Sequence, residues 1–287
     1  MSPILGVAAS TEPGYTIGMP GPLASLYLHF PFCETKCHYC DFYSIGRERT
    51  ADGDAPLFEK ALSQEIELRG HQLAPTLKTI FMGGGTPSMT PPDSMRRALE
   101  PLWKFTSITP ETEWTMEANP SSVDTERLKN YRALGVNRVS MGVQAMRDDL
   151  LLKLGRVHSR DRALKSLDAI FASGMTNVSV DLLCGVPGQS VADVESAMKE
   201  LTRFPITHLS CYLLTLPKTH KMYKELPNEE GQLEHLLAID AYMRSLSFEH
   251  YEISNFAKPG FRAQHNLAYW KRQGYLGLGP SAHSFDP

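Results

Sequence analysis

The sequence has few cysteines and no long apolar segment. Only five cysteines occur in 287 residues, which excludes the disulfide framework of a small secreted protein. No stretch approaches the roughly 18 consecutive apolar residues that a membrane-spanning helix requires, and the first residues lack the basic start and apolar centre of a signal peptide. A net charge of -3, with acidic and basic residues intermixed, gives no attraction toward nucleic acid. We therefore expect a cytoplasmic protein that neither spans a membrane nor binds nucleic acid.

Three of the cysteines stand close together, in the pattern C-x3-C-x2-C at Cys33, Cys37 and Cys40. A 4Fe-4S cluster takes four ligands, so three cysteines at this spacing leave one iron open to an external ligand. The alternatives are a zinc site or three buried thiols, but zinc ligands usually come as two separated C-x2-C halves or with histidines. The sequence contains no second half. The other two cysteines, Cys184 and Cys211, lie in apolar runs and are expected in the core.

Apolar, β-branched runs alternate with longer helical patterns along most of the chain. The strand-like runs cover residues 26–32, 78–82, 113–118, 138–143, 177–183 and 208–216. The helical patterns cover residues 57–71, 92–105, 124–134, 160–173, 190–203 and 229–246. Such alternation implies a parallel sheet with helices outside it. We therefore expect an α/β fold, a partial (β/α)6 barrel of the TIM type.

The chain divides into three parts by pattern. Residues 1–22 are rich in Pro and Gly, carry almost no charge and show no periodicity, so we expect a disordered leader. Residues 23–247 contain the strand-helix units of the barrel. Residues 248–287 are interpreted as the start of a carboxyl-terminal extension.

Glycine and polar residues recur where the predicted strands end, the edge at which such barrels build their active sites. The run Gly83–Pro87 follows the second strand, and its missing side chains let backbone amides approach a ligand closely. Glu117 ends the third strand, Gln144 the fourth, and Asp181 lies on the fifth, while Arg156 follows the fourth. A carboxylate accepts from an ammonium or ribose hydroxyl group, and an arginine can grip a ligand carboxylate with two hydrogen bonds. Taken singly, these residues are better explained by ordinary roles, such as a turn acceptor for Asp181 or a surface ion pair for Arg156.

Taken together, the cysteine pattern and the strand ends resemble the radical S-adenosylmethionine (SAM) superfamily, and its HemN-like branch in particular. The resemblance extends from Leu26 over almost all of the remaining chain. It implies that Cys33, Cys37 and Cys40 hold a 4Fe-4S cluster, with SAM chelating the fourth iron through its amino and carboxylate groups, and that an electron donor serves the cluster. The SAM-contacting positions that it implies are Tyr27, Tyr39, Gly84, Gly85, Thr86, Glu117, Gln144, Arg156 and Asp181.

Two further features narrow the resemblance within that branch. Oxygen-independent coproporphyrinogen III dehydrogenases carry a further cysteine two positions after the third cluster cysteine, where this sequence has Phe42. The CDF and GGGTPS sequences and the later HNLAYW resemble instead the HemW haem chaperone group, whose HNxxYW motif is associated with haem binding. The resemblance implies haem as cargo and haemoproteins as acceptors. The positions that it implies for haem are His265, Asn266, Tyr269 and Trp270.

The residues of this motif allow two physical interpretations. Imidazole is a standard axial ligand of haem iron, and Tyr269 and Trp270 offer flat apolar surface to a porphyrin. A lone histidine beside aromatic residues is nevertheless more often packed or hydrogen-bonded than it is a ligand. Both alternatives are open for His265. The relatives continue into a carboxyl-terminal domain, whereas this chain stops at Pro287, so we expect a naturally short product or a fragment.

These observations predict a radical SAM protein that acts as a haem chaperone. The alternative is an enzyme that uses a 5'-deoxyadenosyl radical in the oxidative decarboxylation of coproporphyrinogen III. A third class, an iron-sulfur scaffold or electron carrier, explains the cysteines but leaves Glu117, Arg156 and Asp181 without a role. The sequence does not indicate which residues would be catalytic.

Overall fold

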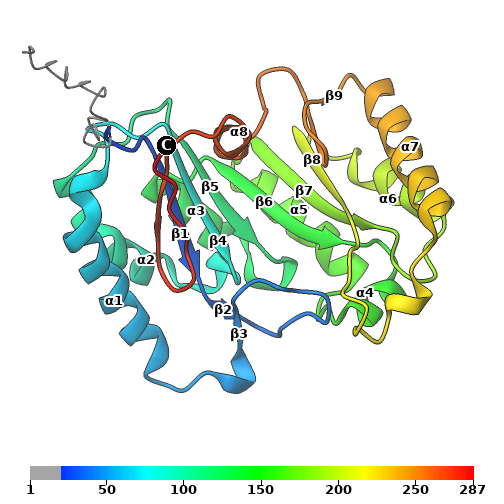
Figure 1. The fold of residues 1–287 in the computed structure, drawn as a ribbon, viewed down its shortest axis with the longest axis horizontal. Helices are drawn as coiled ribbons and strands as arrows, with labels where there is room; N and C mark the ends of the chain where they lie inside the picture. The colour runs from blue at the N-terminus through cyan, green and yellow to red at the C-terminus, as the bar shows by residue number, and fades with distance from the viewer. Residues whose placement is uncertain (1–20) are drawn as a thin grey trace, which may run out of the picture.

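The structure is a computed structural model that describes residues 21–287. The predicted leader therefore lies outside the described residues except for Gly21 and Pro22. Six parallel strands run in sequence order through the middle of a nine-stranded sheet (Figure 1). They are β1 (Ser25–Phe30), β4 (Thr79–Gly84), β5 (Glu113–Ala118), β6 (Arg138–Gln144), β7 (Asn177–Cys184) and β8 (His208–Leu213). Each lies on one of the predicted runs, and the sheet stays open, so the prediction of a partial barrel is confirmed.

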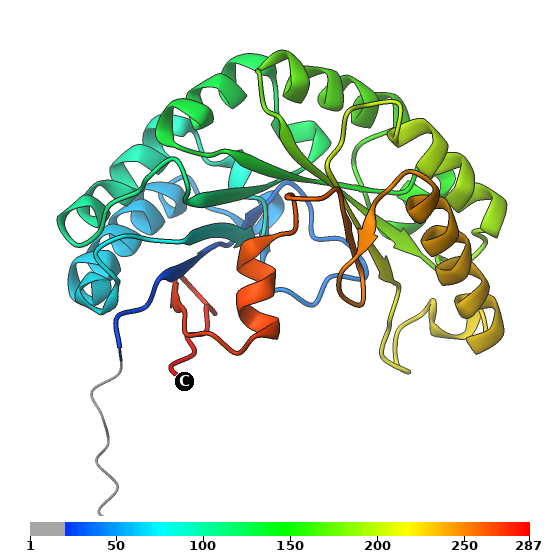
Figure 2. The ribbon, with the colours of Figure 1, turned by 90° about the horizontal axis from the view of Figure 1, so that it is seen from above.

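Helices follow these strands and cover the outer, convex face of the sheet (Figure 2). The predicted helix at 92–105 is α-helical only to Leu99 and continues as a 3-10 helix, because Pro101 has no amide hydrogen for the α-helical ladder. Two short helices, α4 and α8, were not predicted. The α-helices are α1 (Asp54–Arg69), α2 (Pro92–Leu99), α3 (Thr125–Leu134), α4 (Asp148–Leu154), α5 (Arg160–Ala172), α6 (Val191–Leu201), α7 (Glu229–Ser245) and α8 (Gln264–Trp270), and the 3-10 helices are η1 (Arg47–Arg49), η2 (Gly70–Gln72), η3 (Pro87–Met89), η4 (Glu100–Lys104), η5 (Pro120–Ser122) and η6 (Tyr223–Glu225).

The two faces of the sheet differ in polarity. Successive side chains of a strand point to opposite faces, and one set is apolar and buried against the helices. That set includes Leu26, Leu28, Ile80, Met82, Trp114, Met116, Val139, Met141, Val178 and Val180. The alternate set faces the inside of the arc and is largely polar, with Thr79, Thr115, Arg138, Ser140, Ser179, Asp181 and His208. The hydrophobic core therefore lies outside the arc, between strands and helices, and the inside is available for a polar site.

Residues 248–287 extend the same sheet at both edges. Strand β10 (Asn255–Ala257) pairs antiparallel with β8 and with β9 (Glu249–His250), while β11 (Leu276–Leu278) runs parallel to β1. Between these strands, α8 crosses the open side of the arc and packs inside it against β4 (Figure 2). None of the helices in residues 21–287 is long and apolar enough to cross a membrane.

Candidate functional site

The three clustered cysteines lie on a loop at the carboxyl edge of the sheet. The loop joins β2 (Phe32–Cys33) to β3 (Ile45–Gly46), which pair in parallel and close its base (Figure 1). All three thiols are free and partly exposed, and all three line one cavity. Burial raises the pKa of the Cys33 and Cys40 thiols, so these groups are protonated when no metal is bound. Binding of a metal cluster here therefore releases protons.

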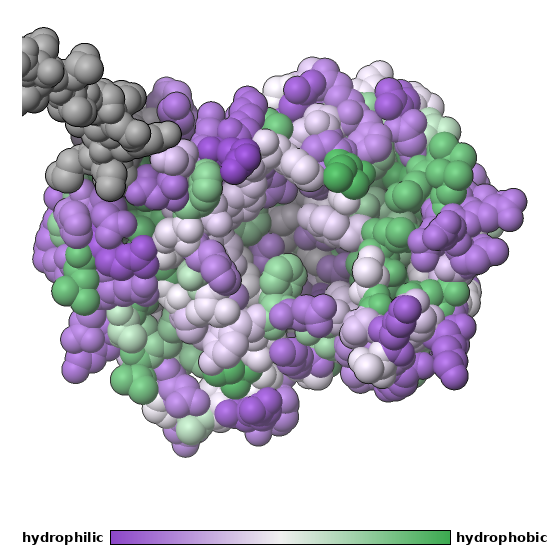
Figure 3. Space-filling view, in the orientation of Figure 1, coloured by the Kyte–Doolittle hydropathy of each residue, from purple (hydrophilic) through white to green (hydrophobic). Residues whose placement is uncertain are grey.

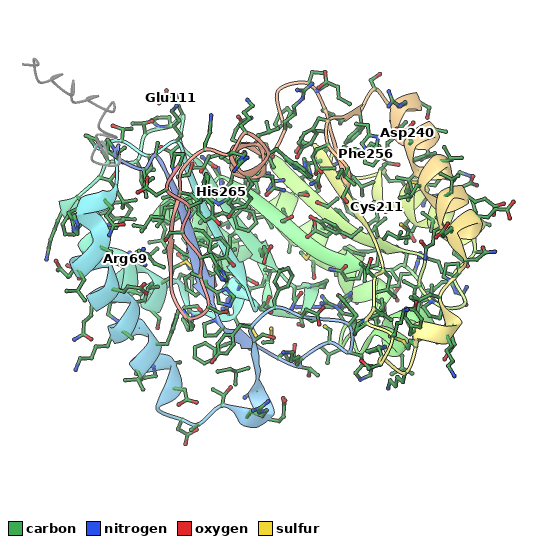
Figure 4. The ribbon with its side chains drawn as sticks, in the orientation of Figure 1. Arg69, Glu111, Cys211, Asp240, Phe256 and His265 are labelled. Carbon is green, nitrogen blue, oxygen red and sulfur yellow. The ribbon has the colours of Figure 1, made fainter. Side chains whose placement is uncertain are left out.

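Hydrogen-bond donors from other strand ends point at two of the sulfur atoms. The Thr86 hydroxyl donates to Cys33 Sγ over 3.6 Å, and Arg156 Nη1 donates to Cys37 Sγ over 3.4 Å. Donors of this kind stabilise thiolate ligands and orient them. Cys184 and Cys211, by contrast, are buried in the core as predicted, and Cys211 lies on β8 away from the cysteine loop (Figure 4).

The cavity next to the cysteines has a volume of about 540 Å³ and opens on the inside of the arc. Figure 3, which looks at this side, shows the molecule hollowed near its centre. Eight of the nine positions predicted for SAM line it: Tyr39, Gly84, Gly85, Thr86, Glu117, Gln144, Arg156 and Asp181. The ninth, Tyr27, lies deeper on β1, where its hydroxyl hydrogen-bonds His29 Nδ1 at 3.1 Å and its ring stacks on Phe81. The parallel sheet thus brings all but one of these positions to one place.

Two carboxyl groups dominate the electrostatics of the cavity. Burial, followed by repulsion from Asp181, raises the pKa of Glu117 to about 8. Burial also raises the pKa of Asp181, against hydrogen bonds from Ser210 and Ser140 that favour its ionised form. The Ser140 hydroxyl lies 3.0 and 3.1 Å from the two carboxylate oxygens of Asp181. Two partly buried acids that face one cavity suit a ligand that brings hydrogen-bond donors or a positive charge.

Arg138 is a cavity residue that the sequence reasoning missed. It lies on the inner face of β6, only 2% exposed, and its positive charge partly offsets the rise in the pKa of both acids. Its Nε has no partner among the described residues, and its Nη1 makes only a long contact of 3.4 Å with Thr115. The sequence did contain a signal for this position. Side chains alternate along a strand, so Arg138 falls on the same side as Ser140 and Gly142.

Arg156 is not arranged as a simple clamp for a ligand carboxylate. Its Nη2 donates to Asn119 Oδ1 at 2.6 Å and to the Gly142 carbonyl at 2.8 Å, so protein atoms use most of its guanidinium. Its buried Nε has no partner in the part of the chain that the structure describes. Arg156 therefore ties the cysteine loop to β5 and β6 and keeps one donor at the wall of the cavity.

The glycine run allows a close approach of two backbone segments. Gly84 has φ of 102°, and a Cβ there would lie 2.5 Å from the His29 ring. A Cβ on Gly85 would lie 2.7 Å from the Phe32 carbonyl oxygen. The Gly85 and Thr86 amides donate instead to the Phe30 and Phe32 carbonyls. Glycine is therefore required for packing against the cysteine loop, whatever ligand lies beyond.

The HNLAYW segment forms α8, and its histidine is fully engaged. His265 is completely buried, with Nδ1 2.8 Å from the Thr79 hydroxyl and Nε2 2.8 Å from the Tyr269 hydroxyl. Its ring also stacks on Phe81, with centroids 5.3 Å apart. Burial lowers its pKa to about 3, so the imidazole is neutral. With both ring nitrogens hydrogen-bonded, His265 cannot be an axial haem ligand in this conformation, and its role here is to fix α8 to the sheet.

The rest of the motif faces a second, more open hollow. Asn266, Tyr269 and Trp270 line a space of about 510 Å³ together with Tyr212 and Ile253. Tyr269 is 40% exposed and Trp270 is 55% exposed. Asn266 and Tyr212 also line the cavity beside the cysteines, so the two spaces share a wall. Of the four motif positions, only His265 does not line this hollow, although its Nε2 contacts the Tyr269 hydroxyl.

Comparison with known proteins identifies the family. Residues 27–201 match the radical SAM superfamily. The chain is 36% identical over 273 residues to the haem chaperone HemW of Bacillus subtilis, covering 92% of this chain and 71% of that protein. It is likewise 36% identical over 269 residues to HemW of Synechocystis, covering 90% of this chain and 65% of the relative. The chain belongs to the HemW family of radical SAM proteins.

The structural comparison agrees about the fold. Coproporphyrinogen III oxidase (HemN) from Escherichia coli, a radical SAM enzyme, superimposes with a TM-score of 0.80 at 24% identity, over 93% of this chain and 66% of that one. At this identity the likeness shows the fold alone. The chain spans about two thirds of the length of its HemW relatives. Membership of the radical SAM superfamily implies a 4Fe-4S cluster and SAM, and three free thiols at the mouth of a polar cavity are a donor set that fits both.

Proposed function

We propose that this protein holds a 4Fe-4S cluster and SAM and acts as a haem chaperone, binding haem and transferring it to acceptor haemoproteins. The observation that carries the cofactor part is the convergence of Cys33, Cys37 and Cys40 on a cavity with two partly buried acids and a glycine-lined wall. The chaperone part follows from the similarity to several HemW proteins. We further propose a cytoplasmic location and an electron donor for the cluster.

The residues of the cavity have distinct proposed roles. Cys33, Cys37 and Cys40 would hold the cluster through three of its irons, and one iron would have no protein ligand. Glu117 and Asp181 accept hydrogen bonds from the ammonium or hydroxyl groups of SAM, and the positive charge of SAM favours the ionised forms of both acids, whose pKa values are raised in the protein alone. When bound, the cluster and SAM supply one-electron chemistry, and the apolar part of the wall limits access of water.

Further roles fall to the residues that support the cysteines. The Thr86 hydroxyl and the Arg156 guanidinium keep two of the sulfurs oriented. Gln144, at the end of β6, has φ of 69°, a left-handed conformation that a non-glycine residue adopts only at some cost. The fold maintains it where the side chain lines the cavity, as a ligand-contacting residue requires.

For the haem, Asn266, Tyr269 and Trp270 remain predicted contacts, because all three line one hollow beside the cofactor cavity and the two aromatic side chains are exposed there. Axial ligation by His265 is not part of the proposal, since both of its ring nitrogens are hydrogen-bonded. The alternative enzyme, a coproporphyrinogen III decarboxylase, is supported only by the likeness of fold, and Phe42 stands where those dehydrogenases carry cysteine.

Experiments on a single reconstituted sample distinguish the haem chaperone from the decarboxylase. The protein is reconstituted anaerobically with iron and sulfide, titrated with haem, and then mixed with an apo-haemoprotein. We expect a shifted Soret band on titration and transfer of the haem to the acceptor. The same sample, given SAM, a reductant and coproporphyrinogen III, should form no vinyl product. Vinyl product would overturn the proposal in favour of the enzyme, and failure to bind haem would remove the chaperone.

A further inference from the structure

Arg138 brings a positive charge into the wall of the cofactor cavity without forming a salt bridge within residues 21–287. The side chain is almost completely buried, and it lines the cavity beside the cysteines. Among the described residues its one hydrogen bond is the long contact from Nη1 to the Thr115 hydroxyl, and its Nε has no partner. Burial of a positive charge is costly unless opposite charge lies nearby. The compensating charge must therefore come from the cavity itself.

The register of the sheet places Arg138 between the two strands that carry the acids of the cavity. Glu117 of β5 lies opposite Ser140 of β6, and Asp181 of β7 lies opposite Gly142 of β6. Arg138 precedes Ser140 by two residues and shares its face of the strand. Its charge acts on both acids, because it opposes the rise in pKa that burial imposes on Glu117 and on Asp181. Arg138 is thus a counter-charge that the two carboxyl groups share.

A chain of hydrogen bonds from β8 ends on one of these carboxyl groups. Burial lowers the pKa of His208 well below its usual range, so its imidazole is neutral, with one donor and one acceptor nitrogen. The Tyr251 hydroxyl accepts a backbone amide hydrogen and therefore donates to His208 Nε2, at 2.7 Å. His208 Nδ1 then donates to the Ser179 hydroxyl at 2.8 Å, and that hydroxyl donates to Asp181 over 3.5 Å. All donors of the chain point toward Asp181, an arrangement that suits its carboxylate form.

The other titratable groups around the two acids do not replace this counter-charge. Burial raises the pKa of the surrounding tyrosine hydroxyls and lowers the pKa of the imidazoles, so these groups are neutral near pH 7: Tyr27, Tyr212, Tyr251, Tyr269, His208 and His265. Asp41 and Arg156 line the cavity together with the three cysteines, and Glu252 lines the hollow beside α8. Of the two arginines in the cavity, Arg138 is the one whose charge acts on both acids.

We infer that Arg138 is a positioning residue for SAM, which acts through Glu117 and Asp181 by making both available as carboxylates when SAM binds. This inference rests on the proposed SAM site. Two acids that face one cavity repel each other when both are ionised, and without a counter-charge one of them takes up a proton. A protonated acid attracts the ammonium and sulfonium charges of SAM less than a carboxylate does. Arg138 therefore sets the pH above which the cavity binds a positively charged ligand.

The test is the pH profile of SAM affinity, measured by calorimetry on the cluster-loaded protein. In Arg138→Met the pH at which affinity is half lost should rise by about one unit, as expected for unit charges several ångström apart in a partly buried site. Below both midpoints this shift lowers affinity about tenfold. Arg138→Lys should restore the wild-type midpoint. The matched control is Arg127→Met, since Arg127 is a half-buried arginine that binds the Ser88 and Met89 carbonyls outside the cavity, and its midpoint should not move.

Two further measurements keep the test decisive. Arg138→Met/Glu117→Gln removes one charge of each sign and is the variant to use if Arg138→Met does not fold; its midpoint should lie about one pH unit above that of Glu117→Gln alone. Urea unfolding without cofactors gives a result that is independent of SAM. Proton uptake by Glu117 on folding stabilises the protein until the pH exceeds its folded pKa of about 8. Arg138→Met raises that pKa, so the loss of stability should move to higher pH, whereas Arg127→Met should lower stability equally at every pH.

The outcomes separate the inference from the function on which it rests. If the cluster-loaded wild type binds no SAM, the proposed SAM site fails, and the unfolding profiles still decide whether Arg138 acts on the two acids. If Arg138→Met loses affinity equally at every pH and its midpoint stays in place, Arg138 contacts the ligand or supports the fold, and the inference is overturned. A midpoint in Arg138→Lys that stays with Arg138→Met would also overturn it, because the retained charge would then have no effect.

Discussion

The cysteine loop and α8 were both singled out by sequence motifs, yet their chemically active atoms are in opposite states. The three thiols are free, partly exposed and aimed at a cavity, with donors oriented toward two of them. The imidazole of His265 is buried and both of its nitrogens are hydrogen-bonded within the fold. The comparison teaches that a ligand-type residue is available for a ligand only where the fold leaves its lone pairs unused. The variants below test this contrast.

The largest effect is expected in the cysteine loop. Cys37→Ala removes one of three protein ligands and should abolish cluster assembly, because two thiolates cannot hold a 4Fe-4S cube in place. Iron content and the visible charge-transfer absorption after anaerobic reconstitution measure this. Cys184→Ala is the matched control and should assemble a full cluster. A full cluster in Cys37→Ala, or its loss in Cys184→Ala, would reverse the assignment.

His265→Ala should act on stability and leave haem binding in place. The change removes a buried ring, two hydrogen bonds and the stacking on Phe81, so we expect a loss of about 2–4 kcal/mol in the free energy of unfolding. Urea denaturation measures the loss, and a haem titration below the midpoint measures binding. Trp270→Ala, at an exposed position of the same helix, should cost less than about 1 kcal/mol. Loss of the haem band without loss of stability would make His265 a ligand after all.

Asp181→Ala should weaken SAM binding roughly ten- to a hundredfold, since a lost charge-assisted hydrogen bond costs about 1.5–3 kcal/mol. Calorimetry on the cluster-loaded protein gives the affinity. Asp161→Ala removes an exposed carboxylate on α5 and should change nothing. Arg156→Ala should lower both SAM affinity and iron content, because this side chain also supports Cys37. Unchanged SAM affinity in Asp181→Ala together with a large fall in melting temperature would show a structural residue.

The smallest effect is a pH dependence of the protein without cofactors. Glu117 has a pKa of about 8 when folded and about 4.3 when unfolded, so it takes up a proton on folding between these values. The stability that the folded protein gains from this proton uptake is fully present below about pH 4 and is lost as the pH rises through 8. The unfolding free energy should fall by up to about 1.4 kcal/mol per pH unit in this window. Glu117→Gln should flatten the slope, whereas Glu100→Gln, at an exposed position, should retain it; equal slopes would refute the assignment.

Much of the fold and of the cofactor cavity could be predicted because the signals are local or geometric. The cysteine spacing is a property of eight consecutive residues, and the strand ends meet because parallel strands share one carboxyl edge. Glu117, Gln144 and Asp181 were found in this way. Their common location follows from the sheet and needs no detail of packing.

What escaped prediction depends on contacts between distant parts of the chain. Helix α8 has only seven residues, and its first amides are capped by Glu113 from β5, far away in the sequence. The orientation of His265 depends on Thr79 of β4, so the motif alone did not reveal which way the imidazole points. Arg138 read as an ordinary strand residue because its burial follows from neighbouring strands.

The polar inner face of the sheet explains why the sheet can remain open and does not close into a barrel. Closing a barrel normally gains free energy by burying apolar side chains in its interior. Here the interior carries Glu117, Arg138, Asp181 and several hydroxyl groups, so bringing the sheet edges together would enclose polar groups and bury little apolar surface in return. The gap between the sheet edges is therefore favoured by the free energy of these alternating residues. A large cofactor can enter through it without any unfolding of the protein.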